Sequence, residues 1–388
     1  MLKKNFLFKS FQKNFLLKKD KNKIIELLKE IARENNEITK SHSNSYKNNY
    51  KKKQLSRYKK KFQNFRVIGM GGSILGTKAI YDFLKHKTKK NFTFIDNLHH
   101  KQFNKKKNFL NLIVSKSGNT LETIVNANVL IKKNDENIFI TENKKSYIQS
   151  LANKLKSEIV HHNNFIGGRY SVLSEVGMLP AELMGLNVNR FKQFDSLIKN
   201  KFFFNSLVNN VASTFFLFKK KKFNSIIINY DEKSENLFNW YRQLIAESLG
   251  KKNKGFLPIL STMPKDNHSV MQFYLEGSKN NFFTFFYVND NEIQKINNKS
   301  ILYSHKFIKN KSISDIIYAQ KKATENVFNK KNIPFRSFEI SKRDEKSLGE
   351  LFCFFTLETI LLGKLLNVNP YDQPAVELIK KETSKILI

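Results

Sequence analysis

The chain has 388 residues, of which 40% are hydrophobic and 13% aromatic, as in a globular protein long enough for two domains. Its one cysteine, Cys353, excludes an intrachain disulfide, and no apolar run reaches the length of a membrane span. The formal charge of +36 would suit nucleic-acid binding, but the lysines are dispersed and rise together with Asn, Ile and Phe. This pattern favours genome base composition as the source of the charge.

The first 45 residues interrupt their apolar positions with lysine every few residues. They lack the continuous apolar core of a signal peptide, and they favour a helical arm packed on a soluble domain over membrane association. We therefore expect a cytoplasmic protein that has neither a membrane nor a nucleic acid among its partners.

From residue 65 onwards, short apolar segments alternate with helical stretches, as buried parallel strands and their crossover helices do. The predicted strands are Phe65–Ile68, Phe92–Ile95, Leu110–Val114, Ile138–Ile140, Ser225–Asn229, Gly255–Leu260, Phe282–Val288 and Phe335–Ile340. The predicted helices are Thr77–Lys85, Leu121–Lys132, Lys145–Lys154, Asn236–Leu249, His268–Gly277, Ser312–Phe328 and Lys346–Leu366. A further helix is expected to follow Pro374.

This order predicts an α/β protein with two doubly wound parallel-sheet domains, each a three-layer αβα arrangement. We expect a helical arm at residues 1–45, the two domains at 46–200 and 201–370, and a C-terminal helix at 371–388.

Two polar loops follow predicted strands of the first domain and are candidates for binding a phosphate. One contains Gly72 and Ser73, and the other, "SKSGNT", contains Ser115, Ser117 and Thr120. Ligands of α/β sheets bind at the carboxyl ends of strands, where glycines allow close approach and helix N-termini attract anions. The alternatives are a tight turn for the first loop and simple helix capping for the second.

Two further segments carry candidate charged groups. In "GGRYS", two glycines would let the backbone bring Arg169 close to an oxyanion, although a surface arginine in a turn is the alternative. In "NWYRQLIAESLGK", Glu247 borders the apolar stripe of a helix, with Gln243 beside it, and could act as a base. The alternative is an i,i+4 salt bridge from Glu247 to Lys251.

His268 and Lys380 are weaker candidates, because a single histidine or a lysine on a charged helix is more often solvated than functional. No Cys/His cluster suggests a metal, and no glycine-rich GxxxxGK[ST] motif suggests nucleotide hydrolysis, so we expect no cofactor.

Taken together, the segments resemble the phosphoglucose isomerase (glucose-6-phosphate isomerase) family, sugar isomerases built of two SIS-type α/β domains. The matching segments occur in the order of the family and are "GMGGSILG", "SKSGNTLET", "GGRYSVLS", "QLIAESLGK", the His268 segment and "DQPAVELIK".

The resemblance implies reversible conversion of glucose 6-phosphate and fructose 6-phosphate through a cis-enediolate, a step of glycolysis and gluconeogenesis. Glu247 would move the proton, Arg169 would stabilise the enediolate, and His268, supplied by the partner subunit of a homodimer, would assist ring opening. Lys380 would lie near the ring oxygen or the sugar hydroxyls. Contacts to the substrate or its phosphate would come from Gly72, Ser73, Ser115, Lys116, Ser117, Thr120, Gln243 and Gln373.

The chain departs from the family pattern at Gly118 and Asn119, and at Ala375, where a glycine is common. These differences concern the breadth of substrates, so an isomerase that also accepts mannose 6-phosphate is the alternative within the enzyme class. A non-catalytic SIS module that binds a phosphosugar is the alternative outside it. Such a module would need the phosphate loops but not Glu247, His268 and Lys380 together.

Overall fold

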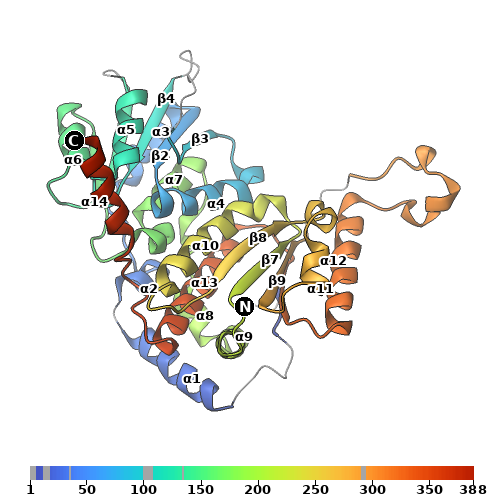
Figure 1. Ribbon diagram of the computed structural model, residues 1–388. Coiled ribbons are helices and arrows are strands. Elements are labelled where there is room, and N and C mark those ends of the chain that lie inside the picture. The colour runs from blue at the N-terminus through green and yellow to red at the C-terminus, as the bar shows by residue number, and fades with distance from the viewer. Residues whose placement is uncertain (1–5, 12–17, 35, 99–107, 133–134, 290–293) are drawn as a thin grey trace.

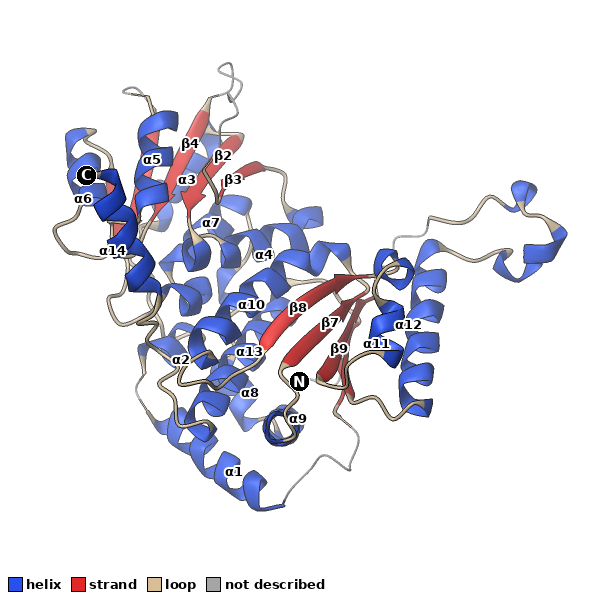
Figure 2. Ribbon diagram, viewed as in Figure 1, coloured by secondary structure: helices blue, strands red, loops and turns tan. Residues whose placement is uncertain are grey.

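The computed structural model describes all residues except 1–5, 12–17, 35, 99–107, 133–134 and 290–293 (Figure 1). In this described part of the chain, two five-stranded sheets lie on either side of a layer of helices (Figure 2). The α/β class predicted from the alternating pattern is confirmed.

The first sheet is wholly parallel and has the strand order β3-β2-β4-β5-β6. Its strands are β2 (Asn64–Gly69), β3 (Asn91–Ile95), β4 (Phe109–Val114), β5 (Glu136–Thr141) and β6 (Glu158–His161). The order reverses between β2 and β4, which makes the carboxyl ends of these two strands the topological switch point of the sheet.

The second sheet has the order β1-β10-β9-β7-β8. Its strands are β1 (Phe6–Lys9), β7 (Asn224–Asn229), β8 (Leu257–Thr262), β9 (Asn281–Val288) and β10 (Phe335–Ile340). Four of them are parallel, and β1 pairs with β10 in the antiparallel sense.

The helices between the two sheets bury one continuous hydrophobic core, to which both sheets contribute one face. Helices of this central layer include α4 (Leu75–Phe83), α7 (Glu175–Met184), α9 (Lys201–Lys219), α10 (Glu235–Leu249) and α13 (Glu345–Leu365). The helix α10 contacts both α4 and α13, so it connects the two halves of the molecule. Cys353 lies buried on α13, as its apolar surroundings in the sequence predict.

The outer face of each sheet is covered by a separate set of helices. The first sheet is covered by α5 (Leu121–Leu130) and α6 (Tyr147–Lys154), and the second by α11 (Met271–Glu276) and α12 (Ile313–Lys330). The remaining helices are α1 (Lys18–Arg33), α2 (Glu37–Ser41), α3 (Lys52–Lys61), α8 (Phe194–Lys199) and α14 (Val376–Leu387).

The N-terminal arm is only partly helical, which corrects the prediction of a helical arm at residues 1–45. Phe6 and Phe8 are buried while Leu7 and Lys9 are exposed, and this period of two is that of a strand with one buried face. The helix α1 does pack on the body through its buried Ile24, Leu28 and Ile31, against α9 and α13.

Two segments stand apart from the packed layers. Residues 294–312 project from the body as a long loop (Figure 1). The C-terminal helix α14 begins after Pro374, as predicted, and has no buried residue. Among the helices of the described residues, none combines the length and the hydropathy needed to cross a membrane.

Candidate active site

The first two candidate loops lie side by side because the strands before them are neighbours. Gly69 at the end of β2 is in register with Val114 at the end of β4. The short 3₁₀ helix η2 (Gly71–Ser73) follows the first strand, and the loop 115–120 follows the second. Both therefore lie at the switch point of the sheet, where ligands of such folds bind.

The loop 115–120 does not have the geometry of a simple helix cap at Thr120. Gly118 has a φ of +66°, a left-handed conformation that glycine adopts readily because it has no Cβ atom. Thr120 precedes α5 as its N-cap, yet its side chain makes no capping hydrogen bond; instead its Oγ1 accepts from Ser115 Oγ at 3.1 Å. Ser117 Oγ accepts from the amide of Asn119 at 3.3 Å. The capping interpretation of Thr120 is therefore wrong.

The charged member of this loop, Lys116, forms an ion pair of 3.1 Å with Glu142, and its side chain is 30% exposed. If a phosphate binds to this loop, the ammonium group of Lys116 and the amides at the start of α5 are available as donors.

Gly72 brings the first loop into contact with the segment that carries Arg169. A Cβ atom on Gly72 would lie 2.2 Å from the carbonyl carbon of Gly168 and 2.5 Å from the amide nitrogen of Arg169. Only a glycine fits, because the atoms that it faces belong to the backbone and cannot rotate away. Ser73 ends the same 3₁₀ helix and is half-buried.

The guanidinium of Arg169 is the centre of the site. The residue is only 2% exposed, so the alternative of a surface arginine is wrong. Its Nε donates to Ser248 Oγ at 2.7 Å, and one terminal nitrogen donates to Gln373 Oε1 at 2.6 Å and to Glu247 Oε2 at 3.2 Å. Arg169 thus joins the candidate base Glu247 to Gln373, which lies more than one hundred positions further along the chain.

The second terminal nitrogen of Arg169 binds the backbone just before Gln373. It donates to the carbonyl oxygen of Pro370 at 2.7 Å and to that of Asp372 at 2.9 Å. Tyr170 OH also donates to the carbonyl of Pro370, at 2.9 Å, and burial raises the pKa of this phenol. The arginine and its neighbour therefore fix the loop 369–373 at the site.

Glu247 lies at the surface end of this network. Its side chain is 30% exposed, and its second oxygen, Oε1, accepts from Gln243 Nε2 at 2.8 Å. Gln243 in turn packs against the first loop, since a Cβ on Gly71 would lie 2.7 Å from its Nε2. The carboxylate is thus held by one neutral and one charged donor, and it remains accessible to a substrate.

The proposed salt bridge from Glu247 to Lys251 does not form. The helix α10 ends at Leu249, so Lys251 lies beyond it and does not have the helical spacing. Its Nζ instead donates to Asp372 Oδ1 at 2.7 Å, to the carbonyl of Asp372 at 2.6 Å and to the carbonyl of Asn369. The ammonium group keeps the pKa of Asp372 below its usual value.

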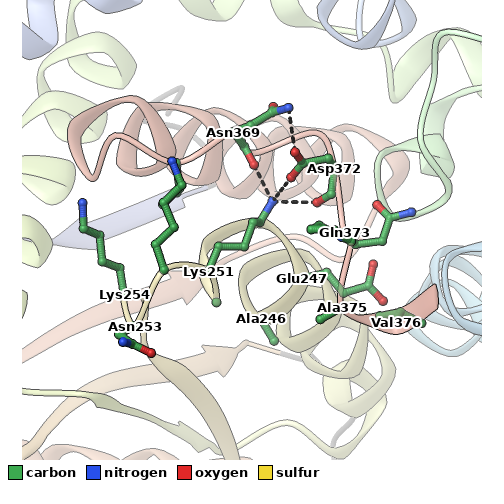
Figure 3. Close-up of a pocket in the computed structure, with 14 residues that line it drawn as sticks. Ala246, Glu247, Lys251, Asn253, Lys254, Asn369, Asp372, Gln373, Ala375 and Val376 are labelled. Atoms are coloured by element: carbon green, nitrogen blue, oxygen red, sulfur yellow. Dashed lines mark hydrogen bonds and ion pairs between the residues drawn. The ribbon is translucent and has the colours of Figure 1, made fainter. Parts of the chain in front are cut away.

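A pocket of about 810 Å³ opens beside this network, with Glu247 and Gln373 on its wall (Figure 3). Lys251 also lines the pocket and is hydrogen-bonded to the loop that carries Asn369 and Asp372 (Figure 3). Space for a small ligand therefore lies directly against the carboxylate of Glu247.

The structure of a single chain leaves two of the candidates outside this cluster. His268 is exposed at the end of the short 3₁₀ helix η7 (Lys265–His268), three residues before α11 rather than at its start as predicted. Lys380 lies on α14 with a side chain that is 60% exposed, and it pairs with Glu377 at 2.7 Å.

Sequence reasoning missed Ser248, Tyr170 and Lys251 as members of the site. All three lie in the segments "GGRYS" and "QLIAESLGK", where Tyr170 follows Arg169, Ser248 follows Glu247 and Lys251 ends the second segment. The partners of Ser248 are Arg169 and Tyr170, and those of Tyr170 and Lys251 include residues 369–372, so nothing local in the sequence signals these contacts. Within the described residues, no group of three or more His, Cys, Asp or Glu side chains is placed to hold a metal ion.

The fold is that of known phosphosugar isomerases. It is similar to a hypothetical protein from Thermus thermophilus, with a TM-score of 0.82, 22% identity, and coverage of 98% of this chain and 100% of that one. It is also similar to a glucose-6-phosphate isomerase from Chlamydia trachomatis, with a TM-score of 0.66, 19% identity, and coverage of 86% and 71%.

The sequence defines the family within this class. Residues 29–388 match the family model described as phosphoglucose isomerase, and the chain belongs to this family. A glucose-6-phosphate isomerase from Methanocaldococcus jannaschii is 36% identical over 347 residues, which cover 82% of this chain and 83% of the relative. One from Mycoplasmopsis pulmonis is 34% identical over 354 residues, with coverage of 83% and 82%.

Proposed function

We propose that the protein interconverts glucose 6-phosphate and fructose 6-phosphate through a cis-enediolate intermediate. The observation that carries the proposal is the contact of Glu247 with Arg169, 3.2 Å apart, beside the loop of Gly71 and Gly72 at the switch point. A base next to a fixed cation is what an enolisation requires, and relatives more than 30% identical bear the name of this activity.

The phosphate would be held by the loop 115–120 and by Gly72 and Ser73. The hydroxyls of Ser115, Ser117 and Thr120 and the amides at the start of α5 are donors that a phosphate needs. Holding the phosphate at the strand ends leaves the opposite end of the open-chain sugar free to reach Glu247.

Proton transfer would then proceed between adjacent carbons. Glu247 takes the proton from C2 of the aldose, the C1–C2 double bond forms, and the C1 carbonyl oxygen becomes an oxyanion. Arg169 stabilises that oxyanion, the proton of the O2 hydroxyl is transferred to O1, and Glu247 returns its proton to C1 to give the ketose. Gln373, which shares the guanidinium with Glu247, orients the sugar hydroxyls.

His268 and Lys380 would join this site from other positions. We infer a homodimer in which His268 of one subunit assists ring opening in the site of the other. Lys380, on the helix that follows Gln373, would approach the ring oxygen when substrate is bound. The exposure of both side chains in the single chain supports this arrangement.

The direct test measures turnover of fructose 6-phosphate by the purified protein, with glucose 6-phosphate and mannose 6-phosphate quantified separately. Glucose 6-phosphate alone is the expected product. Formation of both would make the protein a dual isomerase, with Gly118 and Asn119 as the first residues to exchange. A folded sample that binds sugar phosphate but forms neither product would refute the enzyme proposal in favour of a phosphosugar-binding module.

Subunit complementation tests the shared site. Glu247→Gln and His268→Ala subunits, each inactive alone, should regain about a quarter of wild-type activity when unfolded and refolded together, because heterodimers contain one intact site. The matched control mixes Glu247→Gln with Arg169→Ala, whose residues meet within one chain and should not complement. Failure of the first mixture, with dimers present, would remove His268 from the partner's site.

A further inference from the structure

A buried pair of ionisable side chains lies at the base of the segment that carries Arg169. His162 follows β6, Glu175 is the first residue of α7, and the two side chains meet at 3.3 Å between Nδ1 and Oε2. Neither side chain has any exposed surface. The pair thus joins the two ends of the segment 163–174, which includes Gly168 and Arg169.

The ring of His162 lies between two oxygen atoms, and its charge follows from the state of Glu175. Its Nε2 lies 3.0 Å from the carbonyl oxygen of Ile166, and its Nδ1 faces the carboxylate of Glu175. A carbonyl oxygen and a carboxylate oxygen are both acceptors, so each ring nitrogen must carry a proton to satisfy them. With Glu175 ionised, as its lowered pKa indicates, the pair is an imidazolium and a carboxylate enclosed in the interior.

Further donors stabilise the carboxylate. Tyr46 OH donates to both of its oxygens, at 2.9 and 3.1 Å, and the amide of Asn49 donates at 3.2 Å. Burial by itself would raise the pKa of Glu175, but the bonds from His162, the backbone and Tyr46 outweigh it and keep this pKa below its usual value. Removal of one member of such a buried pair would leave the other charge uncompensated, so the pair holds both side chains in fixed positions.

The segment between the two residues leads directly to the arginine. Ile166, whose carbonyl accepts from His162, is fully buried, and Gly167 caps the 3₁₀ helix η4 (Gly168–Leu173). The carbonyl of Arg169 accepts from Trp240 Nε1 at 3.1 Å, so the backbone of the arginine is held from the central helix α10 as well.

We propose that the ion pair of His162 and Glu175 positions Arg169 for catalysis by fixing both ends of its segment. His162 is then a positioning residue, which acts through the arginine and does not touch the substrate. The inference rests on the role of Arg169 in the proposed function. It predicts that the pair contributes to the transition state, in which the guanidinium meets the oxyanion, more than to substrate binding.

The test compares two variants of the same buried cluster. His162→Gln retains one donor but removes the charge, and it should lower kcat about tenfold with KM changed by less than about twofold, as a small misplacement of a catalytic group does. The matched control, Tyr46→Phe, removes a different donor to Glu175 without releasing the segment. It should lower the thermal midpoint but leave kcat within about twofold of wild type.

A double-mutant cycle separates positioning from general stability. In an Arg169→Ala background, His162→Gln should cause no further loss of kcat, because the group that it positions is gone. Equal loss of kcat in His162→Gln and Tyr46→Phe, or a full additional loss in the Arg169→Ala background, would overturn the inference. An Arg169→Ala enzyme with wild-type turnover would instead refute the proposed role of the arginine itself, and the inference with it.

Two further measurements keep the inference testable if His162→Gln does not fold. Glu175→Gln removes the opposite charge at nearly equal volume, and it should lower kcat while leaving KM almost unchanged, as expected for His162→Gln. In the wild-type protein, the ¹⁵N chemical shifts of His162 should be those of a ring protonated at both nitrogens. A neutral ring, or a Glu175→Gln enzyme with unchanged kcat, would overturn the charged pair as a positioning device.

Discussion

Replacement of Glu247 by glutamine is the sharpest perturbation of the proposed chemistry, because the structure shows how the amide can be accommodated. The new carbonyl oxygen can accept from Arg169, where Oε2 now lies at 3.2 Å. The new amide group would face Gln243, whose Oε1 is buried without a partner and can accept from it after the Gln243 amide turns over. Both contacts of the side chain are thereby retained.

We therefore expect Glu247→Gln to change the free energy of unfolding by less than about 1 kcal/mol. Sugar-phosphate binding should also persist, because the proposed phosphate contacts come from the loop 115–120 and from Gly72. Turnover should fall by about 10² to 10⁴-fold, the usual loss when a general base is removed, which corresponds to about 3–5 kcal/mol in the activation barrier.

The assay is steady-state isomerisation of fructose 6-phosphate, together with exchange of the transferred hydrogen with deuterated solvent. The matched control is Glu235→Gln, an exposed glutamate in the first turn of the same helix, which should retain turnover within about twofold. A folded Glu247→Gln enzyme that keeps more than about a tenth of wild-type turnover would refute the role of Glu247 as the base.

Three further predictions follow from named contacts. Gly72→Ala should destabilise the fold by about 1–3 kcal/mol and lower turnover, because its Cβ would lie 2.2 Å from the carbonyl carbon of Gly168. Gly168→Ala should be tolerated, because the atom nearest to its Cβ would be 3.9 Å away. Chemical denaturation and steady-state kinetics of both variants test this difference. Lys251→Met should release the loop 369–373 and lower kcat/KM about tenfold, because its ammonium group binds that loop at 2.6 and 2.7 Å. Its exposed neighbour gives the control Lys252→Met, and equal kinetics in the two variants would contradict the prediction. Burial lowers the pKa of His42 from 6.5 to about 3, so the folded state keeps this ring neutral and loses roughly 1.4 kcal/mol per pH unit as the pH falls from 6.5 towards 3. His42→Phe should remove that part of the acid sensitivity, and acid-unfolding curves that coincide for the two proteins would show the reasoning to be wrong.

The α/β class, most of the strands and the two loops at the switch point could be predicted from the sequence. These features have local causes, since a buried parallel strand is a short apolar run and a close backbone approach calls for glycine, as at Gly72. The strand Phe6–Lys9 could not be predicted, because Phe6, Leu7 and Phe8 are all apolar and the sequence shows no alternation there. A strand of four residues is also too short to be distinguished from part of an amphipathic helix by pattern alone.

The contacts between the candidate residues depend on the tertiary fold. The sequence placed Arg169 and Glu247 in separate motifs, and only folding joined them through Ser248, Gln373 and the carbonyls of residues 370 and 372. It also replaced the expected partner of Lys251 with Asp372, because the helix ends before the lysine and the i,i+4 geometry is lost. Contacts between residues far apart in the chain depend on how whole elements pack, and no local periodicity encodes them.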